Sequence, residues 1–196
     1  DKESIPGLTS VYRDNPDSVL RQIELDLENG VRKFLLFGVP IYKGLNNFSS
    51  EFTASQIEAI RSRFGKDLWL SADVCLCSST EHGQCGILNH EGDHIDNAAT
   101  VEQLSRTAVE YAKAGADCVA PSDMMDGRVF AIRQALNKMH DDRTLIMSYA
   151  AKFNSRFYGP FRVAADSAPK GNSSKLKDRA TYQIDPARPS DALLSA

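Results

Sequence analysis

The sequence predicts an α/β fold in which buried parallel strands alternate with amphipathic helices. Two observations carry this prediction. Apolar runs without polar alternation recur along the chain, which is typical of strands buried on both faces. Between these runs, apolar residues return at helical spacing. The chain has 196 residues, which is enough for one domain with a sizeable core, so residues 1–196 are expected to form a single domain.

The elements can be placed in order along the chain. A first helix is expected over 16–29, where Val19, Ile23 and Leu27 form one apolar stripe, and Gly30 ends it. Further helices are expected at 53–64, from 100 onward and at 126–138, and strands at 33–39, 68–75, 117–121 and 144–149. The segment from Thr100 to Gln103 has the pattern of a capping box that opens the third helix.

Composition excludes several classes of protein. The chain carries 23 Lys and Arg against 26 Asp and Glu, a net charge of −3, so it has no polybasic face for nucleic acid or anionic lipid. No apolar run approaches the roughly 20 residues of a membrane span. The segment Asp1 to Pro6 is charged and lacks the apolar core of a secretory signal. We therefore expect a soluble, cytoplasmic protein.

Two architectures combine helices with parallel strands in this way, an open doubly wound sheet and a closed barrel. Polar and reactive residues gather where the expected strands end, and this pattern distinguishes the two. No G-x-G-x-x-G follows a strand, so the dinucleotide-binding form of an open sheet is not indicated. Barrel enzymes place their chemistry at the carboxyl ends of the strands. The residues at these ends are Asp73 and Cys75, Ser122 and Asp123, and Ser148 and Lys152.

The strand count predicts only part of such a barrel. A complete TIM-like (β/α)8 barrel needs about 250 residues and eight strands, whereas this chain supplies about four central βα units. The tail from Ser190 to Ala196 resembles the first turn of a further helix. We therefore expect the chain to be a piece of a longer protein.

Three cysteines lie within eleven residues at the end of an expected strand. A disulfide between Cys75 and Cys77 would be strained. With Cys85, these thiols can hold zinc and leave a fourth position open for water or substrate. The alternative is that they are small buried hydrophobic side chains, which is the role expected of Cys118. His82 stays open as a fourth ligand, a donor to a ligand, or a solvated loop residue.

Lys152 lies just beyond the expected strand at 144–149, which we expect to be the most buried. Desolvation and the nearby cations Arg156 and Arg162 would lower the pKa of its amine and free it to attack a ketone. The alternative is a lysine that extends from a strand end into solvent. Arg162 and Arg179 could hold a small carboxylate with an amide, because the arginine fork matches a carboxylate.

Other residues near the strand ends are candidates for substrate binding or for a structural role. Phe157 and Tyr158 would line a pocket or belong to the core. Ser122 and Asp123 would bind a polar group of a substrate. Asp126 is expected to cap the following helix.

Four long segments together closely resemble the porphobilinogen synthase family, also called the 5-aminolaevulinate dehydratases. They are DVCLCSSTEHGQCG (73–86), VAPSDMMDGRV (119–129), MSYAAKFNSRFYGPFR (147–162) and DRATYQ (178–183). The resemblance runs through nearly the whole chain. It implies a TIM-like barrel enzyme that condenses two molecules of 5-aminolaevulinate to porphobilinogen in tetrapyrrole and haem synthesis.

The resemblance also assigns roles to individual residues. It implies that Cys75, Cys77 and Cys85 are zinc ligands and that Lys152 is one of two Schiff-base lysines. It places Arg162, Arg179 and Gln183 at the carboxylate of one substrate, Asp73 and Ser122 near the amino group of the other, and Phe157 and Tyr158 in the pocket wall. It further implies a homo-octamer, and it allows for a magnesium ion elsewhere in the longer protein.

The sequence departs from the family pattern in three places. The second Schiff-base lysine, in a Val-Lys-Pro strand end, and the lid of the site are expected beyond residue 196. The family's N-terminal arm and first barrel strand are expected before residue 1. Gln84 stands where many zinc-dependent members have His. Two alternatives therefore remain: a non-catalytic half barrel that binds zinc, and a Schiff-base aldolase, which would explain Lys152 but not the three cysteines.

Overall fold

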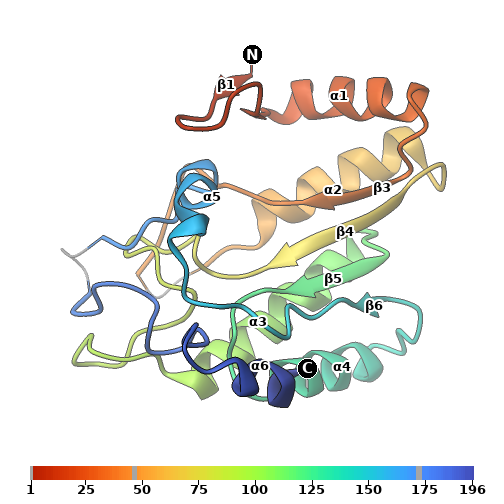
Figure 1. Ribbon diagram of the computed structural model, residues 1–196. Helices are drawn as coiled ribbons and strands as arrows, with labels where there is room; N and C mark the ends of the chain where they lie inside the picture. Colours follow the sequence, from red (N-terminus) through yellow and green to blue (C-terminus); the bar gives the residue numbers. More distant parts are fainter. Residues whose placement is uncertain (1, 46–47, 171–173) are drawn as a thin grey trace.

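The computed structural model describes residues 2–45, 48–170 and 174–196 (Figure 1). The elements, in order, are β1 (Glu3–Ser4), β2 (Tyr12–Arg13), α1 (Pro16–Glu28), β3 (Lys33–Leu36), α2 (Glu51–Phe64), β4 (Trp69–Val74), α3 (Asn97–Lys113), β5 (Cys118–Pro121), α4 (Arg128–Lys138), β6 (Leu145–Ile146), the 3-10 turn η1 (Arg156–Tyr158), α5 (Gly159–Ala164) and α6 (Pro189–Ser195).

Within these residues, β3 to β6 form one parallel sheet of four strands in the order β3-β4-β5-β6. Because all four strands point the same way, their carboxyl ends share one edge of the sheet (Figure 1). The predicted alternation of helices with parallel strands is therefore confirmed. β1 and β2 form a separate antiparallel pair that the sequence did not indicate.

Burial differs between the middle and the edges of the sheet. In β5 every residue is buried, and Leu70, Ala72 and Val74 of β4 are fully buried. The edge strands β3 and β6 are only partly buried, and Leu145 of β6 is 56% exposed. The prediction that all four strands are buried on both faces is therefore wrong for β3 and β6, because each pairs on one side only in the described part of the chain.

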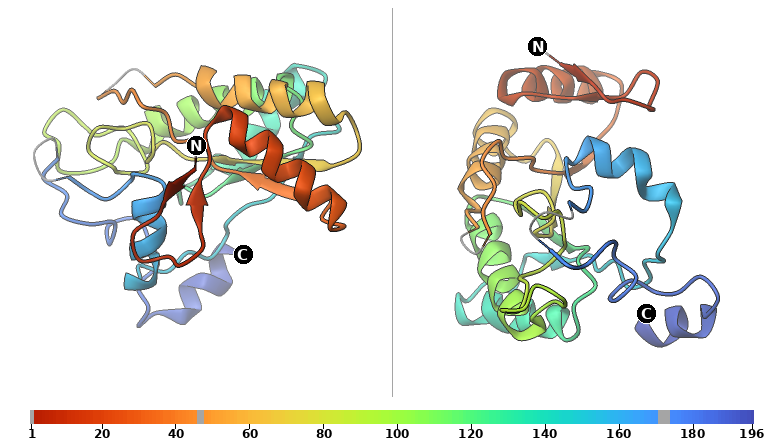
Figure 2. Two further views of the ribbon diagram at one scale, coloured as in Figure 1. Left: turned by 90° about the horizontal axis from the view of Figure 1, so that it is seen from above. Right: turned by 90° about the vertical axis from the view of Figure 1, so that its left-hand side faces the viewer.

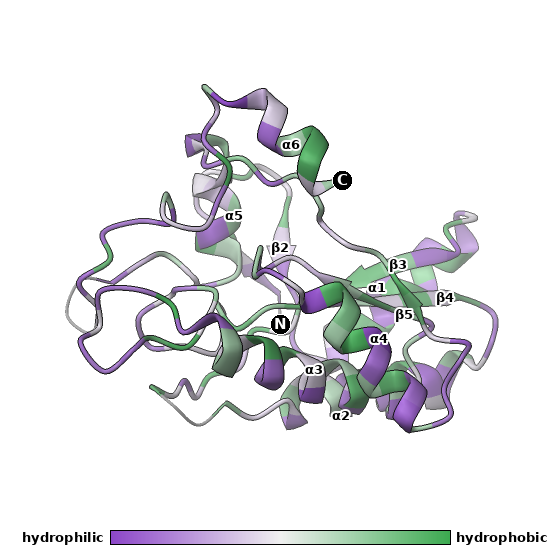
Figure 3. Cartoon of the chain, turned by 90° about the horizontal axis from the view of Figure 1, so that it is seen from below, coloured by the Kyte–Doolittle hydropathy of each residue, from purple (hydrophilic) through white to green (hydrophobic). Residues whose placement is uncertain are grey.

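Three helices cover one face of the sheet. The right-hand view of Figure 2 shows α2, α3 and α4 stacked along one side, with α5 and the chain leading to α6 on the other. The buried residues of these helices include Ile57, Ile60, Leu104, Ile132 and Leu136. Figure 3 shows hydrophobic and hydrophilic residues alternating along α3 and α4, as expected of amphipathic helices. The opposite face of the sheet is left for the loops that follow the strands.

Two predicted helix caps are wrong. Helix α3 begins earlier than expected, at Asn97, because the side chain of Asp96 accepts a hydrogen bond from the Ala99 amide at 3.0 Å. The Thr100 hydroxyl instead donates to the Asp96 carbonyl and accepts from the Ile87 amide. Helix α4 follows Gly127 at φ 79° without a side-chain cap, so Asp126 does not cap it.

The C-terminal segment is a helix, as its sequence indicates, over Pro189–Ser195. The short helical segment made by η1 and α5 was not expected from the apolar pattern. Of the helices in the described residues, none combines the length and the apolar character needed to cross a membrane.

Candidate active site at the carboxyl edge of the sheet

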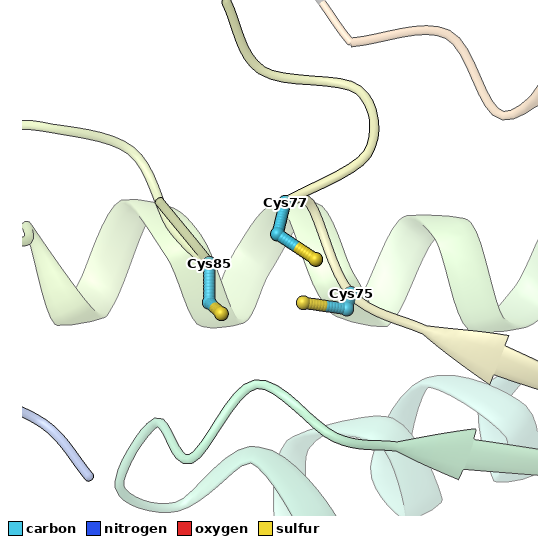
Figure 4. Close-up of side chains that lie close together, drawn as sticks. All are labelled: Cys75, Cys77 and Cys85. Carbon is cyan, nitrogen blue, oxygen red and sulfur yellow. The ribbon is translucent and has the colours of Figure 1, made fainter. Parts of the chain in front are cut away.

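The three clustered cysteines meet directly after β4. The sulfurs of Cys75, Cys77 and Cys85 all lie within 4.8 Å of one another, and the three residues are buried. Figure 4 shows the side chains of Cys75 and Cys77 directed toward each other, with Cys85 beside them. All three thiols are free, so no disulfide forms among them.

A tight loop returns Cys85 to the end of β4. The amides of Ser79 and Thr80 donate to the Leu76 carbonyl, and the Thr80 hydroxyl donates to the Gln84 carbonyl at 3.0 Å. Gly83 turns the chain at φ 71°, and a Cβ placed there would lie 2.4 Å from the Ala168 carbonyl oxygen. Glycine is therefore required by both the backbone angle and the neighbouring chain.

The chemistry of this cluster fits a thiolate-binding metal. Zinc–sulfur bonds of about 2.3 Å in a tetrahedral site place the sulfurs roughly 3.8 Å apart. Hydrogen bonds from the Cys75 and Cys77 thiols lower the pKa of Cys85 well below its ordinary value. Hydrogen bonds with Cys77 and Cys85, together with burial, raise the pKa of Cys75. The cations of Arg179 and Lys152 contribute to lowering the pKa of Cys85.

Side chains around the cluster fix its orientation. The Cys85 amide donates to the Tyr182 hydroxyl at 3.1 Å, and that hydroxyl donates to Gln84 Oε1 at 2.7 Å. Gln84 Nε2 donates to the Leu176 carbonyl. Gln84 thus connects the cysteine loop to the later segment that carries Arg179 and Gln183. Sequence reasoning did not predict these contacts of Tyr182 and Gln84, because they depend on how the loop after β4 packs against the later segment.

His82 is buried, so it is not a solvated loop residue. Its Nδ1 accepts a hydrogen bond from the Gln84 amide at 3.0 Å, and its Nε2 is buried without a partner in the described structure. Burial lowers the pKa of the imidazole. Among the described residues, the group of ligand atoms contains the three cysteines and does not include His82.

Lys152 lies on the same side of the sheet as the cysteines and is buried. Its ammonium donates to the Ser122 carbonyl at 2.7 Å and lies 5.8 Å from the ring of Tyr149 and 5.5 Å from that of Tyr158. The side chain therefore does not extend into solvent. Its loop connects β6 to η1, so the parallel register of β5 and β6 places it beside Ser122.

The pKa of Lys152 shifts in the direction opposite to the one expected from its sequence neighbours. Burial lowers this pKa, but electrostatic interactions with Cys85, Cys75, Cys77 and Asp73 raise it by more, so it lies above its ordinary value. Arg156, one of the two cations invoked in the prediction, is exposed. The groups that raise the pKa come from β4 and the loop that follows it.

Two carboxyl groups near Lys152 have raised pKa values. Burial raises the pKa of Asp73 to about 7, against a hydrogen bond from Ser122 that lowers it, and its Oδ1 is buried without a partner in the described structure. Burial raises the pKa of Asp123 to about 6. Asp123 Oδ1 accepts from the Met125 amide, and its Oδ2 lies 3.5 Å from Arg128 Nε. Arg128 was not singled out in the sequence.

The residues expected to bind a carboxylate gather near the cysteines. Arg179 is buried and donates through Nη2 to the carbonyls of Gly83, at 2.9 Å, and Ser167, at 2.6 Å. Arg179 Nε, Arg162 Nε and Nη2, and both side-chain polar atoms of Gln183 are buried without partners in the described part of the chain. Burial and the charge of Arg179 lower the pKa of Arg162. Apart from Gln183 Oε1, which is an acceptor, these atoms are donors that suit a carboxylate.

The two aromatic residues expected in a pocket wall differ. Tyr158 is partly buried with its ring facing the Lys152 ammonium. Phe157 is 95% exposed, so its side chain lines no pocket in this structure. A cavity of about 620 Å³ opens beside Gln183 and Tyr182 and extends along Met124 and Met125 to α6.

Comparisons with known proteins agree with the resemblance in the sequence. The family model described as Delta-aminolevulinic acid dehydratase matches residues 1–196. A curated relative of that name from Methanothermus sociabilis is 43% identical over 195 residues, and one from Staphylococcus epidermidis is 38% identical over 195 residues. These matches cover 98% of this chain but only 58% and 59% of the two relatives, so the chain spans somewhat over half of their length.

A solved structure is also similar. The delta-aminolevulinic acid dehydratase (porphobilinogen synthase) of Toxoplasma gondii ME49, in complex with the reaction product porphobilinogen, superposes with a TM-score of 0.91 at 34% sequence identity. The match covers 99% of this chain and 55% of that one. The predicted fold, part of a TIM-like barrel, is therefore confirmed.

Proposed function

The chain belongs to the delta-aminolevulinic acid dehydratase family, and we propose that it carries the lysine, metal and carboxylate sites of a porphobilinogen synthase. The reaction is the condensation of two molecules of 5-aminolaevulinate to porphobilinogen in tetrapyrrole synthesis. The observation that carries the proposal is the convergence of three sets of residues on one edge of the sheet. Lys152, the three cysteines and Arg179 are close enough to shift one another's pKa values.

Lys152 is the nucleophile in this proposal. Its neutral amine attacks the ketone carbon of one 5-aminolaevulinate, a carbon–nitrogen bond forms, and the ketone oxygen leaves as water with the two amine hydrogens. The raised pKa of Lys152 means that a proton must leave before the attack. Asp73 is suited to hold and release a proton near neutral pH, because its pKa is raised to about 7.

Arg162, Arg179 and Gln183 hold the carboxylate of the second substrate in this proposal. Their buried polar atoms without partners supply donors that only an anion or another polar group can satisfy. Ser122 and Asp73 lie near the lysine, where the amino group of the first substrate would be. Holding both substrates converts an encounter into a positioned reaction.

The three cysteines would hold a zinc ion. When bound, zinc supplies Lewis-acid chemistry through an open fourth position and compensates the thiolate charges. The buried, mutually close sulfurs support this assignment. The Cys85 amide donates to the Tyr182 hydroxyl, which donates in turn to Gln84, and this chain of hydrogen bonds would keep Cys85 in place. The four free thiols of the chain suit a reducing compartment, which supports a cytoplasmic location.

We also propose that the longer protein assembles as a homo-oligomer, an octamer by family resemblance. Large apolar side chains at the surface support an assembly: Ile41 and Tyr42 after β3 and Leu193 and Leu194 in α6 are each more than 80% exposed.

Borohydride reduction in the presence of 5-aminolaevulinate tests the proposal. We expect the intact mass to increase by one reduced adduct and peptide mapping to place it on Lys152. Lys152→Met should remove the adduct, whereas Lys138→Met, on the outer helix α4, should leave it unchanged. An adduct on another lysine would contradict the assignment of Lys152. The assignment would also be contradicted if the zinc-loaded chain formed no adduct. Zinc binding without an adduct would favour a zinc-binding module without catalysis.

A further inference from the structure

Lys43 is a lysine with an unusually enclosed side chain. It lies in the loop after β3, and its side chain is only 9% exposed. Its ammonium donates to the carbonyl of Ser78 at 2.9 Å and to that of Asp166 at 2.6 Å, and it forms an ion pair with Asp166 Oδ2 at 2.9 Å. No residue of the expected active site contacts this ammonium through its side chain.

We propose that Lys43 is a positioning residue that joins the cysteine loop to the turn between Arg162 and Arg179, and thereby sets the geometry of the metal site and the carboxylate site together. The inference rests on the proposed function, because it assumes that these two sites bind a metal and a carboxylate. Three segments far apart in the sequence meet at this one ammonium: the loop after β3, the loop after β4 and the turn after α5.

On one side, Lys43 and its neighbour hold the cysteine loop. Ser78, whose carbonyl accepts from Lys43, directly follows Cys77. The Gly44 amide donates to the Ser79 carbonyl at 3.0 Å, and the Glu81 amide donates to the Gly44 carbonyl at 3.2 Å. The loop after β3 therefore lies along the outer side of the chain that runs from Cys77 toward Cys85.

On the other side, Lys43 holds the turn that precedes the arginine contact. Asp166 has a left-handed backbone at φ 42°, which a side chain rarely adopts without support. The next residue, Ser167, donates its amide to the Arg162 carbonyl at 2.8 Å and accepts from Arg179 Nη2 at 2.6 Å. The residue that Lys43 contacts is therefore directly followed in the chain by the residue whose backbone contacts both arginines.

An ammonium suits this junction because it offers three donors and carries a charge that a carboxylate can pair with. Without it, two carbonyls and one carboxylate would lose their shared partner. The turn and the cysteine loop would then be free to separate, although β4 and β6, the strands that precede Cys75 and Lys152, would each stay paired with β5. A purely structural lysine would change stability alone, whereas a positioning lysine changes ligand binding in the folded protein.

Lys43→Met is the test variant, because it keeps the length of the side chain and removes the charge and the donors. Lys170→Met is the matched control: Lys170 also pairs with Asp166, at 3.7 Å, but its side chain is 49% exposed. Hydrogen exchange gives a readout that needs no ligand. In Lys43→Met, the amides of Gly44, Glu81 and Ser167 should exchange about tenfold faster, while those of β4 and β5 stay unchanged.

Binding gives the second readout. Zinc is titrated against a competing chromophoric chelator, and levulinate, which has the carboxylate and ketone of 5-aminolaevulinate but no amine, is titrated by calorimetry. We expect Lys43→Met to weaken both affinities by about tenfold or more, as the loss of residues that orient metal ligands does. Lys43→Arg should restore most of both losses, and Lys170→Met should match the unsubstituted chain.

Each outcome decides a separate question. Faster exchange with unchanged zinc and levulinate affinities would overturn the positioning role, and so would unchanged exchange. If Lys43→Met does not fold, Asp166→Asn replaces it, because that variant removes the ion pair and leaves both carbonyl contacts, so a smaller loss in both affinities is expected. Failure of the unsubstituted chain to bind zinc or levulinate would contradict the proposed function, and the exchange experiment would still test the junction at Lys43.

Discussion

Charged groups with little access to water define the candidate site at the scale of single residues. Lys152, Asp123 and Arg179 are each buried, although an isolated buried charge is costly. Neighbouring groups partly compensate these charges. Lys152 interacts with the cysteines and Asp73, Asp123 with Arg128, and Arg179 with two backbone carbonyls and the cysteines. Perturbed groups gathered in this way are typical of a functional site.

Removing one thiol should abolish tight zinc binding. Cys85→Ser takes away the residue whose thiolate the other two cysteines stabilise, so we expect at least a 100-fold loss of zinc affinity, since thiolates are the preferred ligands of such sites. Cys118→Ser is the control, because Cys118 is buried in β5 and lies outside the cysteine group. Equal zinc affinity in the two variants would show that the ion binds elsewhere.

Asp123 should make the free energy of unfolding depend on pH. Its pKa is raised from 3.8 to about 6 in the folded chain, so folding favours the protonated carboxyl. The resulting stabilisation is full below pH 4 and is lost as the pH rises through 6, by up to about 3 kcal/mol. Asp123→Asn lacks this dependence. Urea unfolding from pH 4 to pH 7 should show the unsubstituted chain losing stability relative to this variant. If the free energies of unfolding of the two proteins changed in parallel with pH, the pKa of Asp123 would not be raised.

At the scale of elements, the loop after β4 depends on one glycine. Gly83→Ala would both strain a backbone at φ 71° and place a Cβ 2.4 Å from the Ala168 carbonyl oxygen. Gly92→Ala is a matched control, because Gly92 has φ 69° but no atom within 4 Å of that Cβ. We expect Gly92→Ala to cost about 1 kcal/mol from backbone strain alone.

Gly83→Ala should cost clearly more in urea unfolding and should also weaken zinc binding, because Cys85 and the Arg179 contact at Gly83 both lie on this loop. If Gly83→Ala and Gly92→Ala lost the same stability and kept the same zinc affinity, the loop would not require glycine at position 83.

Sequence patterns predicted the helices better than their ends. The apolar stripe over 16–29 became α1, because periodic burial against a sheet determines where a helix lies. The N-cap of α3 was predicted at Thr100 but lies at Asp96. The Thr100 hydroxyl instead accepts a hydrogen bond from the Ile87 amide. The η1 and α5 segment has too few residues to display a period. The strand β6 covers only Leu145–Ile146 of its apolar run, although the amides of Met147 and Tyr149 still donate to the carbonyls of Val119 and Pro121 in β5.

At the scale of the whole molecule, one rule predicted which residues would meet: reactive residues gather at the carboxyl ends of parallel strands. Cys75, Ser122 and Lys152 follow three neighbouring strands, and the parallel sheet brings them to one edge. The rule could not show that Lys43 and Arg128 would become enclosed, because their contacts come from loops whose path depends on the complete fold. The sequence neighbours of Lys152 also indicated the wrong direction for its pKa, because the groups that raise it come from β4 and the loop that follows β4.

The family comparisons and the folded chain agree at this scale. The chain reproduces a continuous part of the Toxoplasma gondii structure with a TM-score of 0.91 while covering 55% of that chain. β3 and β6 each pair on one side only within the described residues, which is consistent with a sheet that is part of a larger barrel. The central claim is that the cysteines, Lys152 and the arginines serve one reaction at one site.

A crystal structure of the zinc-loaded chain after borohydride trapping with 5-aminolaevulinate tests this claim most directly. Anomalous diffraction at the zinc edge should show one ion bound by Cys75, Cys77 and Cys85. Density for the reduced adduct should be continuous with Lys152 and lie beside the ion. An ion bound away from these sulfurs, or an adduct on a different lysine, would contradict the account.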